Sequence, residues 1–97
     1  MANWQLEALQ SNLTSLIRGI PTRTVLDILQ YDGIITEASV HLILSIPVCF
    51  RNNALLALLF NMSPDAFGCF LLALNQAGRK DLVTLLTVSQ EFKDMKM

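Results

Sequence analysis

The sequence predicts an all-α fold, and three observations carry this prediction. Apolar residues recur at spacings of three and four, which is typical of helices that bury one face. Glycines and prolines stand at the ends of these apolar segments, where they end or begin helices without strain. No stretch alternates apolar and polar residues for long enough to form a strand.

The first two segments each combine an apolar stripe with a boundary signal. Residues 3–18 predict one continuous helix whose opposite face, which includes Gln5, can meet water. Its apolar face holds Leu6, Leu9, Leu13, Leu16, Ile17 and Ile20. A second helix begins between Thr22 and Thr24, either of which could cap it, and stops at Gly33.

Two later segments begin with recognisable caps. Thr36 is a good N-cap, and Glu37 follows in the first turn, where the helix dipole favours a carboxylate. This third helix ends before Pro47, and a fourth spans residues 51–60. The fifth opens at 63–65, a serine followed by proline and an acid.

The fifth and sixth segments complete the bundle. The fifth is apolar nearly all round, so it is expected to be central and covered by the others. The sixth begins near Asp81. Left-handed glycines are expected to close three of the helices: Gly19, Gly33 and Gly78. Residues 1–90 therefore form one domain, and residues 91–97 form a charged tail that frays.

Composition limits the partners. The chain of 97 residues is 53% hydrophobic and 15% charged, below the roughly 25% of an average domain. Its net charge of -1 gives no basic field for nucleic acid. Cys49 and Cys69 form no metal or disulfide motif, and no signal peptide is evident, which predicts reduced thiols in the cytoplasm.

A membrane-associated helical protein stays open as an alternative. Between Ala38 and Gly78 the charged residues are Arg51 and Asp65 alone. A transmembrane span needs about 18 uninterrupted apolar residues, and these charges together with Pro47 cut the stretch into shorter pieces. The sequence therefore favours a globular bundle over a membrane span.

Catalytic chemistry has no recognisable pattern here. His41 could serve a cysteine as a base, but a half-buried helix residue explains it more simply. One histidine and two distant cysteines do not make a four-ligand zinc site, and no phosphate loop or nucleophile elbow occurs. We expect no enzyme activity, cofactor, metal or small-molecule substrate.

Five segments in order resemble the caspase-recruitment domain (CARD) of the death-fold superfamily. They read LDIL at 26–29, DGIITE at 32–37, RNNALLALL at 51–59, PDAFGCFLLAL at 64–74 and GRKDLVTLL at 78–86. The fourth is the sharpest, being similar to the family pattern GPxAFxxFLxAL. The resemblance covers about residues 3–88 and implies an antiparallel six-helix bundle of death-fold (Greek-key) type. Pyrin and death-effector domains share that bundle and stay open as alternatives.

The resemblance also implies a function. Such domains bind copies of their own fold in apoptotic, inflammatory or innate-immune complexes, and some form filaments. The implied partners are other CARD-containing proteins (a caspase, adaptor or sensor) and the chain itself. A basic patch would then hold Arg18 and Arg51, and an acidic patch would hold Asp27, Asp32 and Glu37. Leu55 and Leu56 lie where a further basic residue would be expected.

Overall fold

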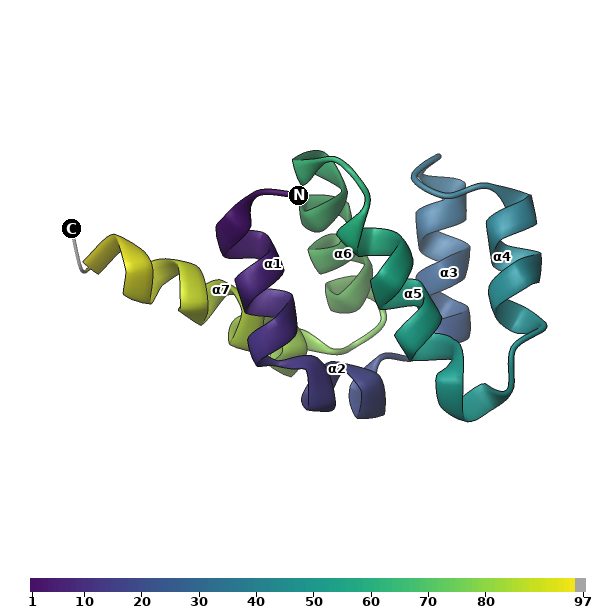
Figure 1. Cartoon of the computed structure of the whole chain (residues 1–97), viewed down its shortest axis with the longest axis horizontal. Coiled ribbons are helices and arrows are strands. Elements are labelled where there is room, and N and C mark those ends of the chain that lie inside the picture. Colours follow the sequence, from purple (N-terminus) through teal and green to yellow (C-terminus); the bar gives the residue numbers. More distant parts are fainter. Residues whose placement is uncertain (96–97) are drawn as a thin grey trace.

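The architecture is all-helical throughout the part of the chain that the structure describes. The computed structural model describes the backbone of residues 1–95 and the side chains of residues 1–88. Within these limits it contains helices and no strand, which confirms the predicted fold class (Figure 1). The helices are α1 (Asn3–Ser11), α2 (Leu13–Gly19), α3 (Thr22–Tyr31), α4 (Glu37–Leu44), the 3₁₀ helix η1 (Val48–Phe50), α5 (Arg51–Phe60), α6 (Pro64–Gln76) and α7 (Lys80–Met95).

The first predicted helix is broken in two at Asn12. Asn12 adopts φ -112° and ψ 19°, and its side-chain amide donates to the carbonyl of Ala8 at 2.8 Å. A short amide side chain that bonds to its own turn competes with the helical backbone and favours a break. The prediction of one continuous helix over residues 3–18 is therefore wrong, and α1 and α2 follow each other as separate helices.

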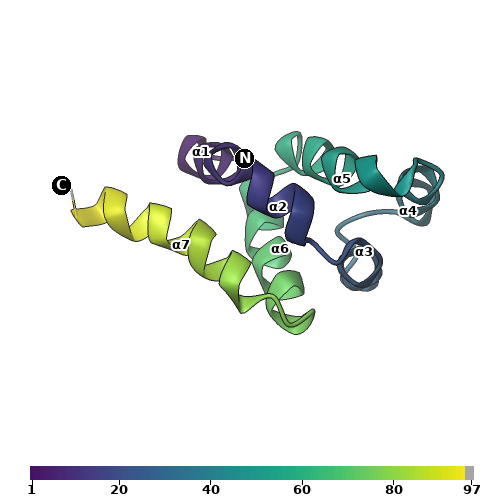
Figure 2. The ribbon, with the colours of Figure 1, turned by 90° about the horizontal axis from the view of Figure 1, so that it is seen from below.

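Helix α6 occupies the middle of the molecule. It packs against α3 on one side and against α7 on the other, with α1 and α2 beside α7 and α4 beside α3 (Figure 2). Its side chains Phe67 and Phe70 are the largest fully buried ones. The ring of Trp4 in α1 meets Phe67 edge to face, with centroids 5.1 Å apart. The predicted central position of this helix is confirmed.

Burial corrects two expectations from the apolar pattern. Gln5 is buried, and hydrogen bonds satisfy its polar atoms there. Its side chain accepts from the amide of Ala2 at 3.0 Å and donates to the carbonyl of Pro64 at 3.3 Å. It thereby joins the start of α1 to the start of α6. Leu72, by contrast, is 59% exposed on α6, so the other helices leave one side of that helix open.

The predicted helix signals hold in part. The hydroxyl of Thr36 accepts from the amide of Ser39 at 3.1 Å and caps α4 as expected, whereas Ser63 stands at the N-cap of α6 without a side-chain cap bond. Gly33 and Gly78 have the left-handed φ values of 77° and 82° that favour glycine. Gly19 does not, because it is the last residue of α2.

The C-terminal segment falls mostly outside the described side chains. Helix α7 continues through Met95 and extends away from the bundle along the long axis (Figure 1). The side chains of residues 89–97 and the backbone of 96–97 are not among those described. The prediction of a charged, frayed tail at 91–97 lies there and stays a prediction.

Candidate functional site

The three predicted acidic residues lie at the end of the molecule formed by α3 and α4. Asp27 is in α3, Asp32 directly follows it, and Glu37 begins α4; all three are exposed. Asp27 lies 3.8 Å from the guanidinium of Arg23, one turn earlier. Such exposed pairs contribute about 0–1 kcal/mol, so they leave these carboxylates available to a partner.

His41 is exposed, and the expectation of a half-buried residue is wrong. Its Nε2 lies 3.4 Å from Oε1 of Glu37, one turn earlier on the solvent face of α4. Two of its apolar neighbours in the sequence, Val40 and Ile43, are buried in the core instead. His41 therefore belongs to the acidic end of the molecule.

The two predicted basic residues have different environments. Arg18 is exposed in the last turn of α2. Arg51 is partly buried, and its guanidinium donates to the carbonyl of Ile46 at 2.9 Å and to that of Leu44 at 2.8 Å. These oxygens lie at the end of α4 and just beyond it, where helix carbonyls lack intrahelical partners. Arg51 thus fastens the connection between α4 and α5.

Leu55 and Leu56 lie in the core, although the sequence pattern placed them where a basic surface residue would stand. Both are fully or almost fully buried between α5 and its neighbours. The exposed positions of α5 are instead Asn53 and Ala57. The outer face of α5 therefore carries no charged side chain after Arg51.

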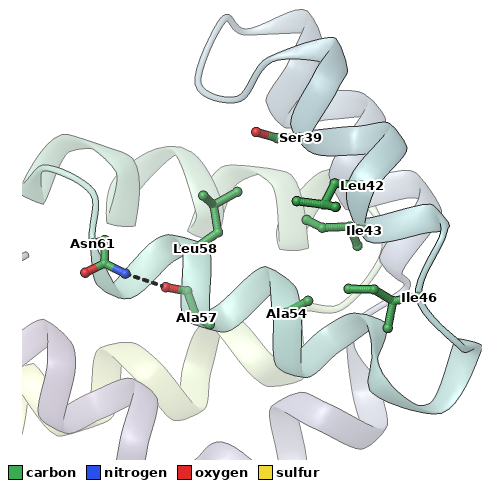
Figure 3. A pocket seen from close by; sticks show the side chains of 8 residues that line it. All are labelled: Ser39, Leu42, Ile43, Ile46, Ala54, Ala57, Leu58 and Asn61. Carbon is green, nitrogen blue, oxygen red and sulfur yellow. Dashed lines mark hydrogen bonds between the residues drawn. The ribbon is translucent and has the colours of Figure 1, made fainter.

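An apolar groove lies between α4 and α5, and sequence reasoning missed it. Its volume is about 290 Å³, and Figure 3 shows side chains of both helices around it. They are Ser39, Leu42, Ile43, Ile46, Ala54, Ala57, Leu58 and Asn61. None of these side chains is charged. The charge-poor stretch from residue 38 onward was the available signal, but it did not show which residues would stay on the surface.

Large apolar side chains stand on the surface of α4 and of the connection to α5. Leu42 in α4 is 67% exposed. Val48 and Phe50 lie in η1, within the connection between the two helices, and are 75% and 59% exposed. Of these three side chains, Leu42 is the one that lines the groove. Exposed apolar residues that stand singly are ordinary on protein surfaces.

A second feature is the bond network of Arg79, which directly precedes α7. Its guanidinium donates to both carboxylate oxygens of Asp81, at 3.0 and 2.8 Å, and to the carbonyl of Gly19 at 2.7 Å. The contact is close, since a Cβ on Gly19 would lie 3.0 Å from Nη2 of Arg79. Arg79 thereby ties the start of α7 to the end of α2.

The Arg79–Asp81 pair makes stability depend on pH. Hydrogen bonding to Arg79 lowers the pKa of the Asp81 carboxyl below its ordinary value. A carboxyl with a lowered pKa in the folded state stabilises the fold above its ordinary pKa and loses that contribution as pH falls through the lowered one. The free energy of unfolding in urea should therefore be larger for wild type than for Asp81→Asn at neutral pH. The difference should close as the pH falls below about 4.

Asp65→Asn is the matched control for this measurement. It removes an acidic residue from the first turn of α6, as Asp81→Asn does for α7, but leaves the Arg79 network in place. If the difference in unfolding free energy between wild type and Asp81→Asn stayed constant from neutral to acid pH, this would contradict the assigned role of Arg79.

A buried polar contact joins α5 to the connection between α2 and α3. The side-chain amide of Asn52 donates to the carbonyl of Ile17 at 2.8 Å and to that of Ile20 at 3.0 Å. Its oxygen accepts from the hydroxyl of Thr22. Asn52 is itself buried, so it supplies the end of α2 with donors that water cannot replace.

Three general findings complete the description. Among the described residues, no group of three or more histidines, cysteines, aspartates or glutamates is placed to hold a metal ion. No helix in the described part is long and apolar enough to cross a membrane. No protein-family model matches the chain, and no curated protein matches it either.

Proposed function

We propose that this chain is a death-fold interaction module of the CARD type, which binds copies of its own fold. The observation that carries the proposal is the surface of the bundle: large apolar side chains stay exposed on a helical domain with few charges. Apolar surface of this kind favours association between proteins. The five quoted sequence segments support the choice of family. When α1 and α2 are taken as one broken helix, the order of six α-helical segments also agrees with it.

Charge is proposed to select the partner rather than to supply most of the affinity. The acidic end of the molecule, with Asp27, Asp32 and Glu37, is suited to a basic surface that includes Arg18. Exposed ion pairs weaken in salt, whereas burial of apolar surface does not. The chain should therefore self-associate with rising concentration, and the association should persist at high ionic strength.

Sedimentation across protein concentration and salt tests this expectation, with electron microscopy of any large species. A chain that stays monomeric at every concentration would overturn the proposal. Complexes that dissociate to monomers as salt rises would show that ion pairs dominate instead.

Charge reversal tests the selecting role of the patches. Arg18→Glu and Asp27→Lys should each weaken association about five- to tenfold while leaving the helix content unchanged. The double variant should recover association, because opposite charges again face each other between copies. If the double variant associated as weakly as the single variants, Arg18 and Asp27 would not face each other in the contact. Arg51→Glu is less informative, since it would also free the carbonyls of Leu44 and Ile46.

The membrane-associated alternative makes a different prediction for the same purified chain. Much of the apolar content of residues 38–78 fills the core, including Leu55, Phe67 and Phe70. That burial favours an interaction module over a membrane protein. Partition of the chain into lipid vesicles, without self-association in buffer, would favour the alternative.

A further inference from the structure

Helix α6 contains a glycine that its own chain does not require. Gly68 lies within α6 and, unlike Gly33 and Gly78, does not have a left-handed φ. A Cβ built at this position would meet no heavy atom within 4 Å, so a larger residue would fit there. Glycine weakens a helix interior relative to alanine, and one reason to keep it is the close approach of another molecule to the backbone. Gly68 therefore marks a part of α6 that a second molecule can approach closely.

Gly68 borders a hollow between α6 and α7, which we call the α6–α7 hollow. Its volume is about 440 Å³, and its wall is formed by Gly68, Leu71, Leu72, Asn75, Lys80, Val83 and Thr84. Leu72 is 59% exposed, so apolar surface in the hollow is open to solvent. Lys80 is its one charged residue and makes no ion pair with any side chain of residues 1–88. The hollow thus suits an apolar side chain that has a carboxylate beside it.

The turn after α3 offers this combination. Tyr31 ends α3 and is 91% exposed, and Asp32 follows it directly. Among the large apolar side chains that are exposed in residues 1–88, Tyr31 alone has a carboxylate next to it in the sequence. Asp32, like Lys80, makes no ion pair with a described side chain. A second copy of the chain therefore carries the chemistry that the hollow requires.

Backbone hydrogen bonds hold this turn in one shape. The amide of Asp32 donates to the carbonyl of Ile28 at 2.9 Å, and that of Gly33 donates to the carbonyl of Gln30 at 3.0 Å. A group that is fixed before binding loses less conformational entropy when it docks. A tyrosine side chain has only two χ angles, so it supplies a large contact area at a small entropy cost. The turn is thus well suited to insert Tyr31 into a partner.

The hollow also adjoins the basic surface that includes Arg18. Arg18 directly precedes Gly19, and Lys80 directly follows Arg79. The hydrogen bond from Arg79 to the carbonyl of Gly19 joins these two segments. The basic surface therefore extends from the end of α2 to the start of α7, and the acidic end of another copy can meet it along this length.

We propose that Tyr31 of one copy enters the α6–α7 hollow of the next copy, with Asp32 facing Lys80. This inference rests on the proposed self-association and names the side chain that anchors it. Helices α3 and α7 pack on different sides of α6, so one copy can offer its turn and its hollow to two neighbours (Figure 2). A contact between unlike surfaces leaves one turn and one hollow unused at the ends, so further copies can add to an open chain.

Two variants test the contact from its two sides. Tyr31→Ala removes the inserted side chain, and Gly68→Gln fills the hollow. Each should weaken self-association at least about tenfold, as measured by sedimentation equilibrium. Gly68→Gln should at the same time raise the free energy of unfolding in urea, because glutamine is a better helix former than glycine. Opposite effects on folding and on association separate a blocked hollow from a damaged bundle.

Mixing the two variants tests whether these two surfaces meet. The Tyr31→Ala chain keeps an open hollow, and the Gly68→Gln chain keeps its tyrosine. An equimolar mixture should therefore form a one-to-one complex of about wild-type affinity and add no further copies. Ala57→Gln is the control, since it places the same side chain at an exposed position of α5 beside the α4–α5 groove. It should change self-association by less than about twofold.

Each outcome decides the question. Weak association of both single variants, with recovery in the mixture, supports the inference. If neither variant weakens association, or if Ala57→Gln weakens it equally, the inference is overturned but the proposed self-association stands. Two weakened variants that do not recover on mixing would show that Tyr31 and the hollow do not meet, which also overturns the inference. A wild-type chain that never associates overturns both proposals.

Discussion

Replacing Asn52 with aspartate is expected to lower the free energy of unfolding by about 3–5 kcal/mol. The amide donates to the carbonyls of Ile17 and Ile20, and a carboxylate of the same shape has no proton to donate. Two carbonyl oxygens would then face a buried negative charge. Urea unfolding at neutral pH measures the loss, and a domain of this size has little stability to spare.

The neighbouring residue supplies the control. Asn53 is exposed on the same turn of α5, so Asn53→Asp makes the same chemical change in water. It should alter stability by no more than about 0.5 kcal/mol. Similar losses in the two variants would mean that Asn52 does not support the end of α2.

Truncating Phe70 to alanine is expected to cost about 3–5 kcal/mol. Its ring is fully buried in α6, the helix that lies between α3 and α7. Removing it leaves a cavity at the centre of the bundle, which neighbours on several helices would have to fill. Thermal or urea unfolding checks this value.

Leu72→Ala, two residues further along the same helix, is the comparison for this truncation. Its side chain is mostly exposed, so the loss should stay below about 1 kcal/mol. A small loss for Phe70→Ala together with a large one for Leu72→Ala would contradict the orientation of α6 and the position of the core.

The sequence predicted most elements because their signals are local. Helix α5 spans residues 51–60 as expected, and Thr36 caps α4 through a bond within its own turn. The start of α6 at Pro64 was likewise predictable from that proline and the serine before it. Signals of this kind act over a few residues and need no knowledge of the packing.

The misassigned features depend on contacts between distant segments or on competition within a turn. From the sequence alone, Arg79 resembles an ordinary surface residue. Its role depends on the carbonyl of Gly19, which is sixty residues away in the sequence. Arg51 was predicted to bind a partner, but its guanidinium binds the carbonyl of Leu44, because the end of α4 lies next to the start of α5. The break at Asn12 arises because its side chain competes with the backbone, which apolar periodicity does not report.

The candidate surface was predictable only in its exposed acids. Asp27 and Glu37 lie outward because charged side chains avoid burial. The leucines of the 38–78 stretch gave no such guidance. Leu42 is exposed and Leu55 is buried, and the packing of α4 against α5 determines which of these leucines faces the solvent.

The edge-to-face contact of Trp4 with Phe67 gives the chain an internal optical reporter. Trp4 is the single tryptophan, and it joins α1 to the central helix, away from α4 and η1. Its emission therefore follows the separation of α1 from α6, because α4, η1 and α5 carry no tryptophan. Fluorescence of the unlabelled protein can thus distinguish a variant that has lost its fold from one that has lost only its partner.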